Sequence, residues 1–163
     1  ADAGYCYVGA LKDCDRTFIV ALLACGWPNN KGYKWADTRK LMEYGIANYE
    51  YRNVWEDVKL PDIFVADGIE EGDPYKAQTE IPLCAKGKGE LYVLLRQDES
   101  VEVKTEIDDS LQAPVKAGEE AGRIRYLLDG EEIASYAVVT ERDMDKKDLE
   151  WAVRWILRMM SLY

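Results

Sequence analysis

The segment DAGYCYVGALKDCDRTFIVALLAC, residues 2–25, decides how the start of this chain folds. Two apolar runs, YCYVGAL and TFIVALLAC, flank the polar stretch KDCDR. This pattern predicts an antiparallel hairpin with a five-residue connection. The second run is almost continuously apolar, so both of its faces should be covered. Because too little chain precedes it to cover either face, we expect these to be inner strands of a larger sheet.

Composition limits the classes of protein that this chain can belong to. Its 163 residues suit one ordinary domain or two small ones, and 48% hydrophobic content is enough for a packed core. The net charge of -10 argues against nucleic acid as a partner. No apolar run reaches the roughly 18–20 residues that a membrane-spanning helix needs.

Charge is distributed unevenly along the chain. Residues 1–53 have a net charge of +1, residues 54–145 of -13 and residues 146–163 of +2. These differences divide the chain into a nearly neutral start, an acidic middle and a basic tail. The small positive charge of the tail is of the sign that an anionic membrane leaflet attracts.

The chain has four cysteines and no histidine. Without histidine or a CxxC pair, neither a zinc site nor a Ser-His or Cys-His catalytic pair is expected, and no metal or other cofactor is predicted. We expect four free and mostly buried thiols: Cys6, Cys14, Cys25 and Cys84. Pairing the hairpin around its turn puts Cys6 opposite roughly Leu22 rather than Cys25, so a disulfide there would need a register shift.

A helix is predicted over WADTRKLMEYGIANYEY, residues 35–51. Its apolar positions recur at spacings of three and four and should lie across the hairpin: Leu41, Met42, Gly45, Ile46 and Tyr49. From Val54 onward the chain reads as short strands, namely LPDIFVA, EIPLCAK, ELYVLLR, VEVKTEI, RIRYLLD and EIASYAVVT. This spacing predicts a small antiparallel β-sandwich.

Two connections between these strands have a sequence signal. QDES, between ELYVLLR and VEVKTEI, suits a hairpin connection, and Asp129-Gly130 is a strong two-residue hairpin signal. VEVKTEI alternates, with Val101, Val103, Thr105 and Ile107 on one face and charged residues on the other.

The final stretch, DKKDLEWAVRWILRMMSLY, predicts an amphipathic helix that Asp145 or Asp148 could cap. Glu150, Arg154 and Arg158 form an i,i+4 ladder along a narrow polar stripe. Trp151, Trp155, Ile156, Met159 and Met160 belong to a wide apolar face. This combination favours a helix lying in a membrane interface, with those five residues and the two arginines at the surface. The alternative is packing on its own domain or on a second copy of the chain.

No catalytic constellation is visible in the residues. The acidic clusters at 70–73 and 108–110 lack EF-hand spacing and are interpreted as solvated strand ends and turns. None of the serines lies in a G-x-S-x-G turn, and no phosphate-binding loop is present.

The segment AGYCYVGALKDCDRTFIVALLAC, followed by a loop and DTRKLMEYGIANYEY, resembles the end of the catalytic domain of serine-type D-alanyl-D-alanine carboxypeptidases, the low-molecular-weight penicillin-binding proteins. In that family a Lys-Thr-Gly strand is followed by an Ala-Gly-Tyr-like stretch, two strands and a final helix. Ala3–Tyr5 matches the strand entry, and KLMEYG, Lys40–Gly45, matches the helix motif.

The segment Leu111–Val139 is similar to the C-terminal β-domain of the same family. Ala113-Pro114, Gly122 and Asp129-Gly130 fall at the positions of its pattern. The family also ends in an amphipathic helix that binds the membrane face. The resemblance thus covers nearly the whole chain in order.

The resemblance implies a fold that is mainly β with two helices (α+β). Residues 1–53 would be a β-hairpin and helix left from a transpeptidase-like catalytic domain. Residues 54–141 would be the β-sandwich domain, and residues 142–163 the amphipathic helix. The family's Ser-x-x-Lys, Ser-x-Asn and Lys-Thr-Gly motifs are absent, and by position Lys-Thr-Gly should lie just before Ala1. This chain alone is therefore expected to be inactive.

The parent enzyme would remove the terminal D-alanine from peptidoglycan stem peptides through a serine acyl-enzyme, outside the bacterial cell and at its membrane. Lys34 lies where the family often has a basic residue near the substrate-binding edge. Expected partners are the missing catalytic portion, the stem peptide and the membrane surface. Two orphan strands also predict self-association through the hairpin edge.

Two other interpretations remain open. The chain could be a standalone, non-catalytic β-sandwich interaction module at the cell envelope. It could also be a soluble β-domain whose terminal helix packs in a homodimer.

Overall fold

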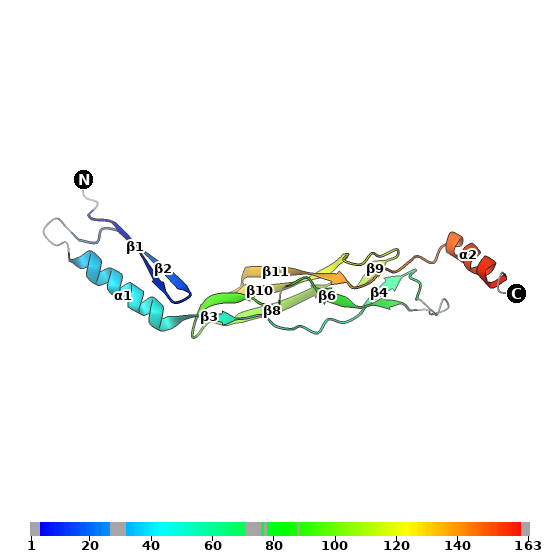
Figure 1. Cartoon of the computed structure of the whole chain (residues 1–163), viewed down its shortest axis with the longest axis horizontal. Helices are drawn as coiled ribbons and strands as arrows, with labels where there is room; N and C mark the ends of the chain where they lie inside the picture. The colour runs from blue at the N-terminus through cyan, green and yellow to red at the C-terminus, as the bar shows by residue number, and fades with distance from the viewer. Residues whose placement is uncertain (1–3, 27–31, 71–75, 77, 88, 161–163) are drawn as a thin grey trace. The chain divides into compact units, whose positions relative to one another are not determined.

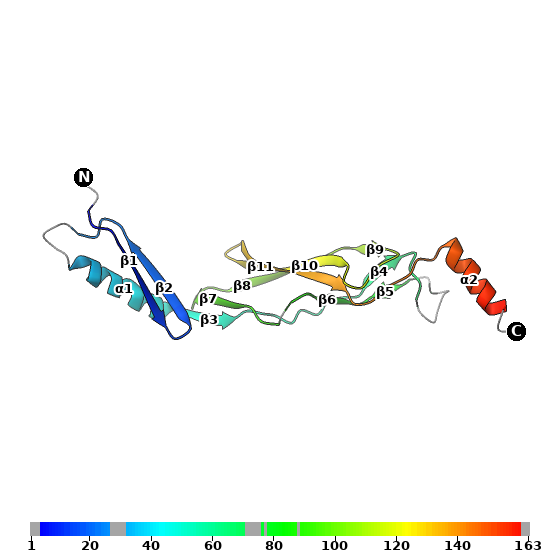
Figure 2. The same cartoon turned by 45° about the horizontal axis from the view of Figure 1, so that its top comes forward.

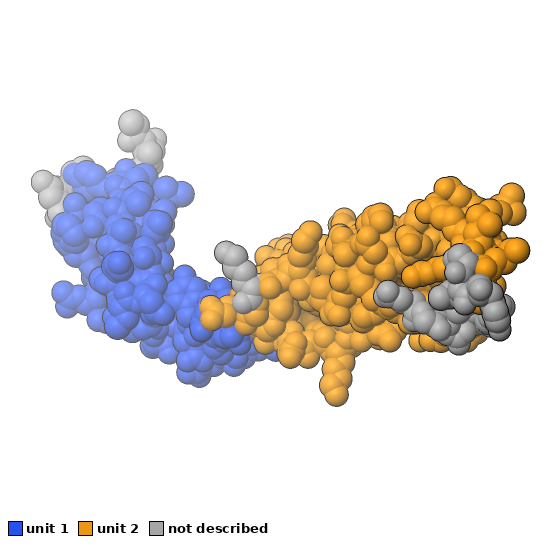
Figure 3. Space-filling view, turned by 45° about the vertical axis from the view of Figure 1, so that its right-hand side comes forward, with its two compact units in different colours: residues 1–54, 91–100 blue, residues 55–90, 101–163 orange. Residues whose placement is uncertain are grey.

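The structure is a computed structural model that describes residues 4–26, 32–70, 76, 78–87 and 89–160 (Figure 1). Its contacts divide the chain into two compact units (Figure 3). Unit 1 comprises residues 1–54 and 91–100, and unit 2 comprises residues 55–90 and 101–163. The fold class is as predicted: mainly β, with a hairpin and helix first, an antiparallel sheet next and a helix last.

Unit 1 is built from a hairpin, a helix and a second strand pair. The hairpin strands β1 (Tyr7–Asp13) and β2 (Arg16–Leu22) are antiparallel, and α1 (Tyr33–Asn48) packs on them. Strand β3 (Tyr49–Asn53) follows α1 directly and pairs with β7 (Tyr92–Arg96). Figure 2 shows α1 running alongside the hairpin.

The hairpin is confirmed, but its predicted five-residue connection is wrong. Asp13 pairs with Arg16, so only Cys14 and Asp15 form the turn, and Cys14 adopts a positive φ of 54°. Tyr7 pairs with Leu22, which leaves Cys6 opposite the end of β2 and not opposite Cys25, as predicted.

The four cysteines are free, but the prediction that most are buried is wrong. Cys6 and Cys14 are exposed, while Cys25 and Cys84 are half-buried. Cys14 is exposed because the turn is so short that this residue lies at its tip. Cys6 precedes β1, outside the part of the hairpin that pairs with α1.

The predicted helix over residues 35–51 is confirmed in its centre and wrong at its end. Tyr49 is extended, with φ −116° and ψ 136°, and it opens β3. The Arg16 guanidinium donates to the Ile46 and Tyr49 carbonyls, which satisfies helix-end acceptors. Strand pairing with β7 therefore replaces a last helical turn.

Only part of the predicted apolar face of α1 is buried. Met42 and Gly45 are buried, whereas Leu41 is 47% exposed and Ile46 37% exposed. A Cβ on Gly45 would lie 2.9 Å from the Phe18 ring. Glycine thus lets the helix approach the hairpin closely at this point.

The described residues of unit 2 form two sheets. The four-stranded sheet has the order β6 (Leu83–Ala85), β11 (Glu131–Thr140), β10 (Glu120–Leu128), β8 (Val101–Ile107) and is antiparallel. The three-stranded sheet has the order β5 (Glu80–Ile81), β4 (Ile63–Ala66), β9 (Ser110–Gln112), with β4 and β9 parallel. Helix α2 (Leu149–Met160) ends the described chain.

The Asp129-Gly130 hairpin is confirmed, whereas the QDES hairpin is wrong. Leu128 pairs with Glu131 across Asp129 and Gly130, which both have positive φ, 51° and 83°. Such a pair of angles matches the twist of a two-residue hairpin. Strand β8 pairs with β10, while β7 pairs with β3.

Alternation along β8 is nearly as predicted. Val101, Val103 and Ile107 are half-buried, and the charged residues between them are exposed, but Thr105 is also exposed.

At the centre of unit 2, Tyr126 is fully buried and stacks on Trp55, with ring centroids 6.0 Å apart. Burial raises the pKa of the Tyr126 hydroxyl above its usual 10.0.

Candidate functional site at the terminal helix

Helix α2 begins at an aspartate cap. The Asp148 carboxylate accepts a hydrogen bond from the Trp151 N–H at 2.8 Å. An N-cap of this kind satisfies one of the free N–H groups of the first turn. Of the two predicted caps, the second is therefore confirmed, and Asp145 has another role: its main-chain carbonyl accepts from the Ile69 N–H at 3.1 Å.

The apolar side of α2 is uncovered. None of its residues is buried, and Leu149 and Met160 are 81% and 71% exposed. The Trp151 and Trp155 rings stack at 6.1 Å, and both are half-buried. The other apolar residues predicted for a membrane interface are exposed: Ile156, Met159 and Met160.

The polar stripe of α2 contains an ion pair. Arg154 Nη2 lies 2.6 Å from Glu150 Oε1, one turn away along the helix. Arg158 continues the stripe toward the C-terminus and is exposed. A cation in the last turn also suits the partial negative charge of that helix end.

Residues 142–148, here called the strap, connect β11 to α2 and are held by main-chain hydrogen bonds. Val115 and Met144 exchange N–H···O bonds, both at 2.9 Å. The Lys147 N–H donates to the Asp67 carbonyl at 2.7 Å. Gly68 and Lys146 form an isolated β-bridge. The root of α2 is therefore fixed to the body of unit 2.

Gly68 allows the strap to lie this close. A Cβ at this position would overlap the Met144 sulfur and lie 2.7 Å from Thr79 Oγ1. Met144 and Thr79 are both buried, and the Thr79 hydroxyl donates to the Val65 carbonyl at 2.8 Å. A side chain larger than glycine would therefore have to displace these two buried side chains.

Ion pairs link the strap to neighbouring segments. Arg142 lies 3.1 Å and Lys76 3.3 Å from the Glu70 carboxylate, and the bond to Arg142 is the main cause that holds the pKa of Glu70 below its usual 4.5. Asp143 accepts from the Ala117 N–H and pairs with Lys116, which lowers the pKa of the Asp143 carboxyl. When ionised, both carboxylates therefore stabilise the contacts that hold the strap against unit 2.

Lys34, the predicted substrate-binding residue, lies near the N-terminus of α1. Its ammonium is 4.9 Å from the centroid of the Trp35 ring and 5.7 Å from that of the Tyr7 ring, a cation–π arrangement. Its role toward a substrate stays a prediction. The strand entry Ala3–Tyr5 begins outside the described residues, as do residues 71–73 of one acidic cluster.

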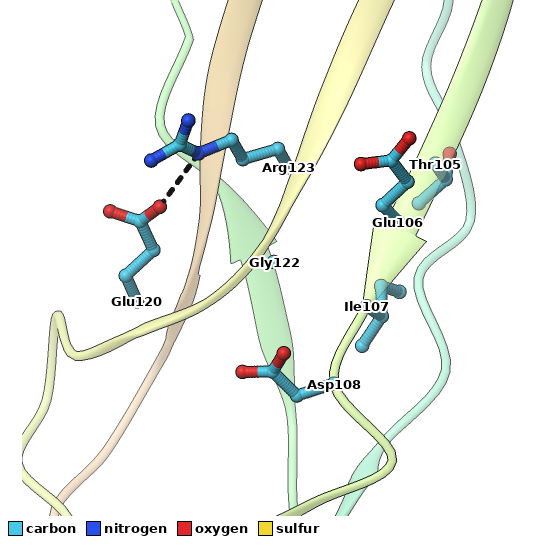
Figure 4. A pocket seen from close by; sticks show the side chains of 7 residues that line it. All are labelled: Thr105, Glu106, Ile107, Asp108, Glu120, Gly122 and Arg123. Carbon is cyan, nitrogen blue, oxygen red and sulfur yellow. Dashed lines mark hydrogen bonds and ion pairs between the residues drawn. The ribbon is translucent and has the colours of Figure 1, made fainter.

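Acidic side chains line a hollow between β8 and β10, and Figure 4 shows one of them, Glu120, paired with Arg123. Glu120 pairs with Arg123 at 2.9 Å, and Glu106 pairs with Arg125 at 3.0 Å. Asp108 lies exposed between β8 and β9. In the part of the chain that the structure describes, no group of three His, Cys, Asp or Glu side chains is placed to hold a metal ion.

Neither described helix has both the length and the apolar character needed to cross a bilayer.

The strap contacts were not found from the sequence. Their only local signal was Asp67-Gly68, a turn dipeptide, and nothing in it pairs Gly68 with Met144, 76 residues later.

The fold and the strap define a β-domain that ends in an amphipathic helix. Residues 69–146 match the family described as "Penicillin-binding protein 5, C-terminal domain". This segment of the chain is therefore similar to that C-terminal domain.

A D-alanyl-D-alanine carboxypeptidase is similar to this chain over almost its whole length. The chain is 24% identical to the D-alanyl-D-alanine carboxypeptidase DacA of Haemophilus influenzae over 99% of its own length. It spans 40% of the length of that protein.

Two crystal structures share the fold. The D-alanyl-D-alanine carboxypeptidase DacD of Francisella tularensis has a TM-score of 0.51 and 23% identity, over 89% of this chain and 34% of that one. A peptidoglycan synthesis regulatory factor, PBP3, of Streptococcus pneumoniae has a TM-score of 0.50 and 20% identity, over 88% and 40%.

Proposed function

We propose that this chain is the non-catalytic, membrane-proximal part of a D-alanyl-D-alanine carboxypeptidase of the bacterial cell envelope. The whole enzyme removes the terminal D-alanine from peptidoglycan stem peptides through a serine acyl-enzyme. The observation that carries this proposal is the family match over residues 69–146, together with the uncovered apolar face of α2 directly after it.

Unit 1 would brace the catalytic sheet. On the hairpin face turned away from α1, Val8, Ile19 and Leu23 are 69%, 73% and 81% exposed. Val8 pairs with Ala21 and Ala10 with Ile19, so this face is apolar up to the Lys12–Thr17 pair next to the turn. A β-layer with one helix on one side needs cover on the other, which the catalytic portion would supply.

Unit 2 would hold the catalytic domain at the membrane, with α2 lying in the lipid interface. An interfacial helix needs a wide apolar face, tryptophans and a charged stripe, and α2 has all three. Because the strap fixes the root of α2, docking of the helix would also dock unit 2.

Vesicle co-sedimentation tests the docking role. Leu157→Glu places a charge on the apolar face, where Leu157 is 60% exposed, and should move the protein from the pellet to the supernatant. Ile133→Glu is the matched control, since Ile133 is 38% exposed on β11 and should leave binding unchanged. A protein that stays in the supernatant without any substitution favours the homodimer interpretation.

Labelled penicillin tests the catalytic part of the proposal. This chain alone should not become covalently labelled, because the family's serine and lysine motifs are absent from it. Labelling of the chain would contradict the assignment of the nucleophile to another part of the enzyme.

A further inference from the structure

The charged groups at the root of α2 determine whether the chain prefers an anionic or a zwitterionic lipid surface. The tail alone has a net charge of +2, which suggests attraction to anionic lipids, while the whole chain has -10, which suggests repulsion. The outcome depends on how many cations near the helix are free to contact a lipid headgroup.

Four basic side chains around the strap already have partners within the protein. Lys116 lies 2.9 Å from Asp143, and Arg142 and Lys76 share Glu70 at 3.1 Å and 3.3 Å. Lys147 donates to the Lys76 carbonyl at 3.2 Å. A headgroup phosphate would have to compete with each of these contacts.

The polar stripe of α2 also contains a cation that is already paired. Arg154 pairs with Glu150 at 2.6 Å, in the first half of α2. The strap and helix together, residues 142–160, contain five basic and four acidic residues, which gives a net charge of +1. Each uncompensated cation near an anionic surface strengthens binding only about fivefold.

The apolar face makes the larger contribution. Each methylene group transferred from water into an apolar phase strengthens binding about fourfold. Leu149, Ile156, Leu157 and Met160 are each at least 52% exposed, so insertion removes many such groups from water. Insertion of apolar side chains does not depend on the charge of the lipid.

We infer that α2 docks onto a zwitterionic lipid surface by inserting its apolar face, and that anionic lipids are not required. This inference rests on the membrane role proposed above. In dilute salt the screening length exceeds about 20 Å, so the acidic remainder of the chain is also felt by the bilayer. Anionic lipids should then weaken docking.

The test is co-sedimentation of the chain with phosphatidylcholine vesicles and with vesicles in which a third of the lipid is phosphatidylglycerol. Binding to both is expected at high salt, with similar affinity. At low salt, binding to the anionic vesicles should be weaker. Binding to anionic vesicles alone, lost at high salt, would overturn the inference and leave the membrane role intact. Absence of binding to both would overturn the membrane role and the inference together.

A pair of variants tests the role of internal pairing. Glu150→Gln frees Arg154 and should raise affinity for the anionic vesicles about fivefold, with little change for the zwitterionic ones. Glu102→Gln is the control: it removes the same charge from the chain by breaking a 3.3 Å pair with Lys104 on β8. An equal rise in both variants, or in neither, would contradict local pairing as the cause.

Discussion

Gly68 and Met144 lie so close that any side chain at Gly68 would overlap the Met144 sulfur. The contact joins the segment after β4 to the strap that leads into α2. It explains how a helix with no buried residue can still have a fixed root.

Gly68→Ala should destabilise unit 2 by about 1–3 kcal/mol, because the added methyl group overlaps Met144 and Thr79 and forces these buried neighbours to shift. The measurement is the free energy of unfolding in urea. Gly118→Asn is the control for a side chain that overlaps nothing: a Cβ at Gly118 meets nothing within 4 Å, so only the strain of its φ of +86° remains, and the loss of stability should be smaller. Equal stability of Gly68→Ala and the unsubstituted chain would contradict the close packing of the strap.

Arg16→Met should destabilise unit 1 by about 1.5–3 kcal/mol, because the guanidinium donates to two carbonyls at the end of α1 and pairs with Asp13. Amide hydrogen exchange in α1 is the measurement, and its protection should fall. Arg39→Met, on the exposed side of α1, should leave protection unchanged. A similar loss in both variants would show that Arg16 has no special role.

Acid should loosen the strap through Glu70. The pKa of Glu70 is lower in the folded chain than the usual 4.5, mainly because of Arg142. A lowered pKa means that the ionised group stabilises the fold above pH 4.5, and that this contribution is lost as the pH falls through the lowered value. Glu70→Gln should therefore be less stable than the unsubstituted chain at neutral pH.

Urea unfolding at a series of pH values checks this expectation. The difference in midpoint between the two proteins should shrink as the solution is acidified below pH 4.5. A difference that stays constant from neutral to acid pH would show that ionised Glu70 does not hold the strap.

Local patterns predicted the elements well where one short segment determines the conformation. Asp129-Gly130 specifies its own turn, and Asp148 caps α2 with an N–H three residues away. The end of α1 was missed because β7 competes for Tyr49–Asn53 from 39 to 47 residues away. The partner of β7 was missed for the same reason.

In the candidate site, too, local features could be predicted from the sequence and long-range contacts could not. The two faces of α2 are visible in a single helical repeat, so Trp151, Trp155 and Arg154 could be named from the sequence. The pairing of Glu70 with Arg142 and the contact of Gly68 with Met144 join residues more than 70 positions apart. No periodicity encodes such contacts, although they determine the charge and rigidity at the root of the helix.

The central claim is that α2 lies in the lipid interface, and tryptophan fluorescence tests it most directly. Vesicles with brominated lipids quench indoles that enter the bilayer, and the quenching should be strongest for bromines placed near the headgroups. The double substitution Trp151→Phe and Trp155→Phe should abolish it, which assigns the signal to α2. Quenching that is absent, or that survives the double substitution, would contradict the claim.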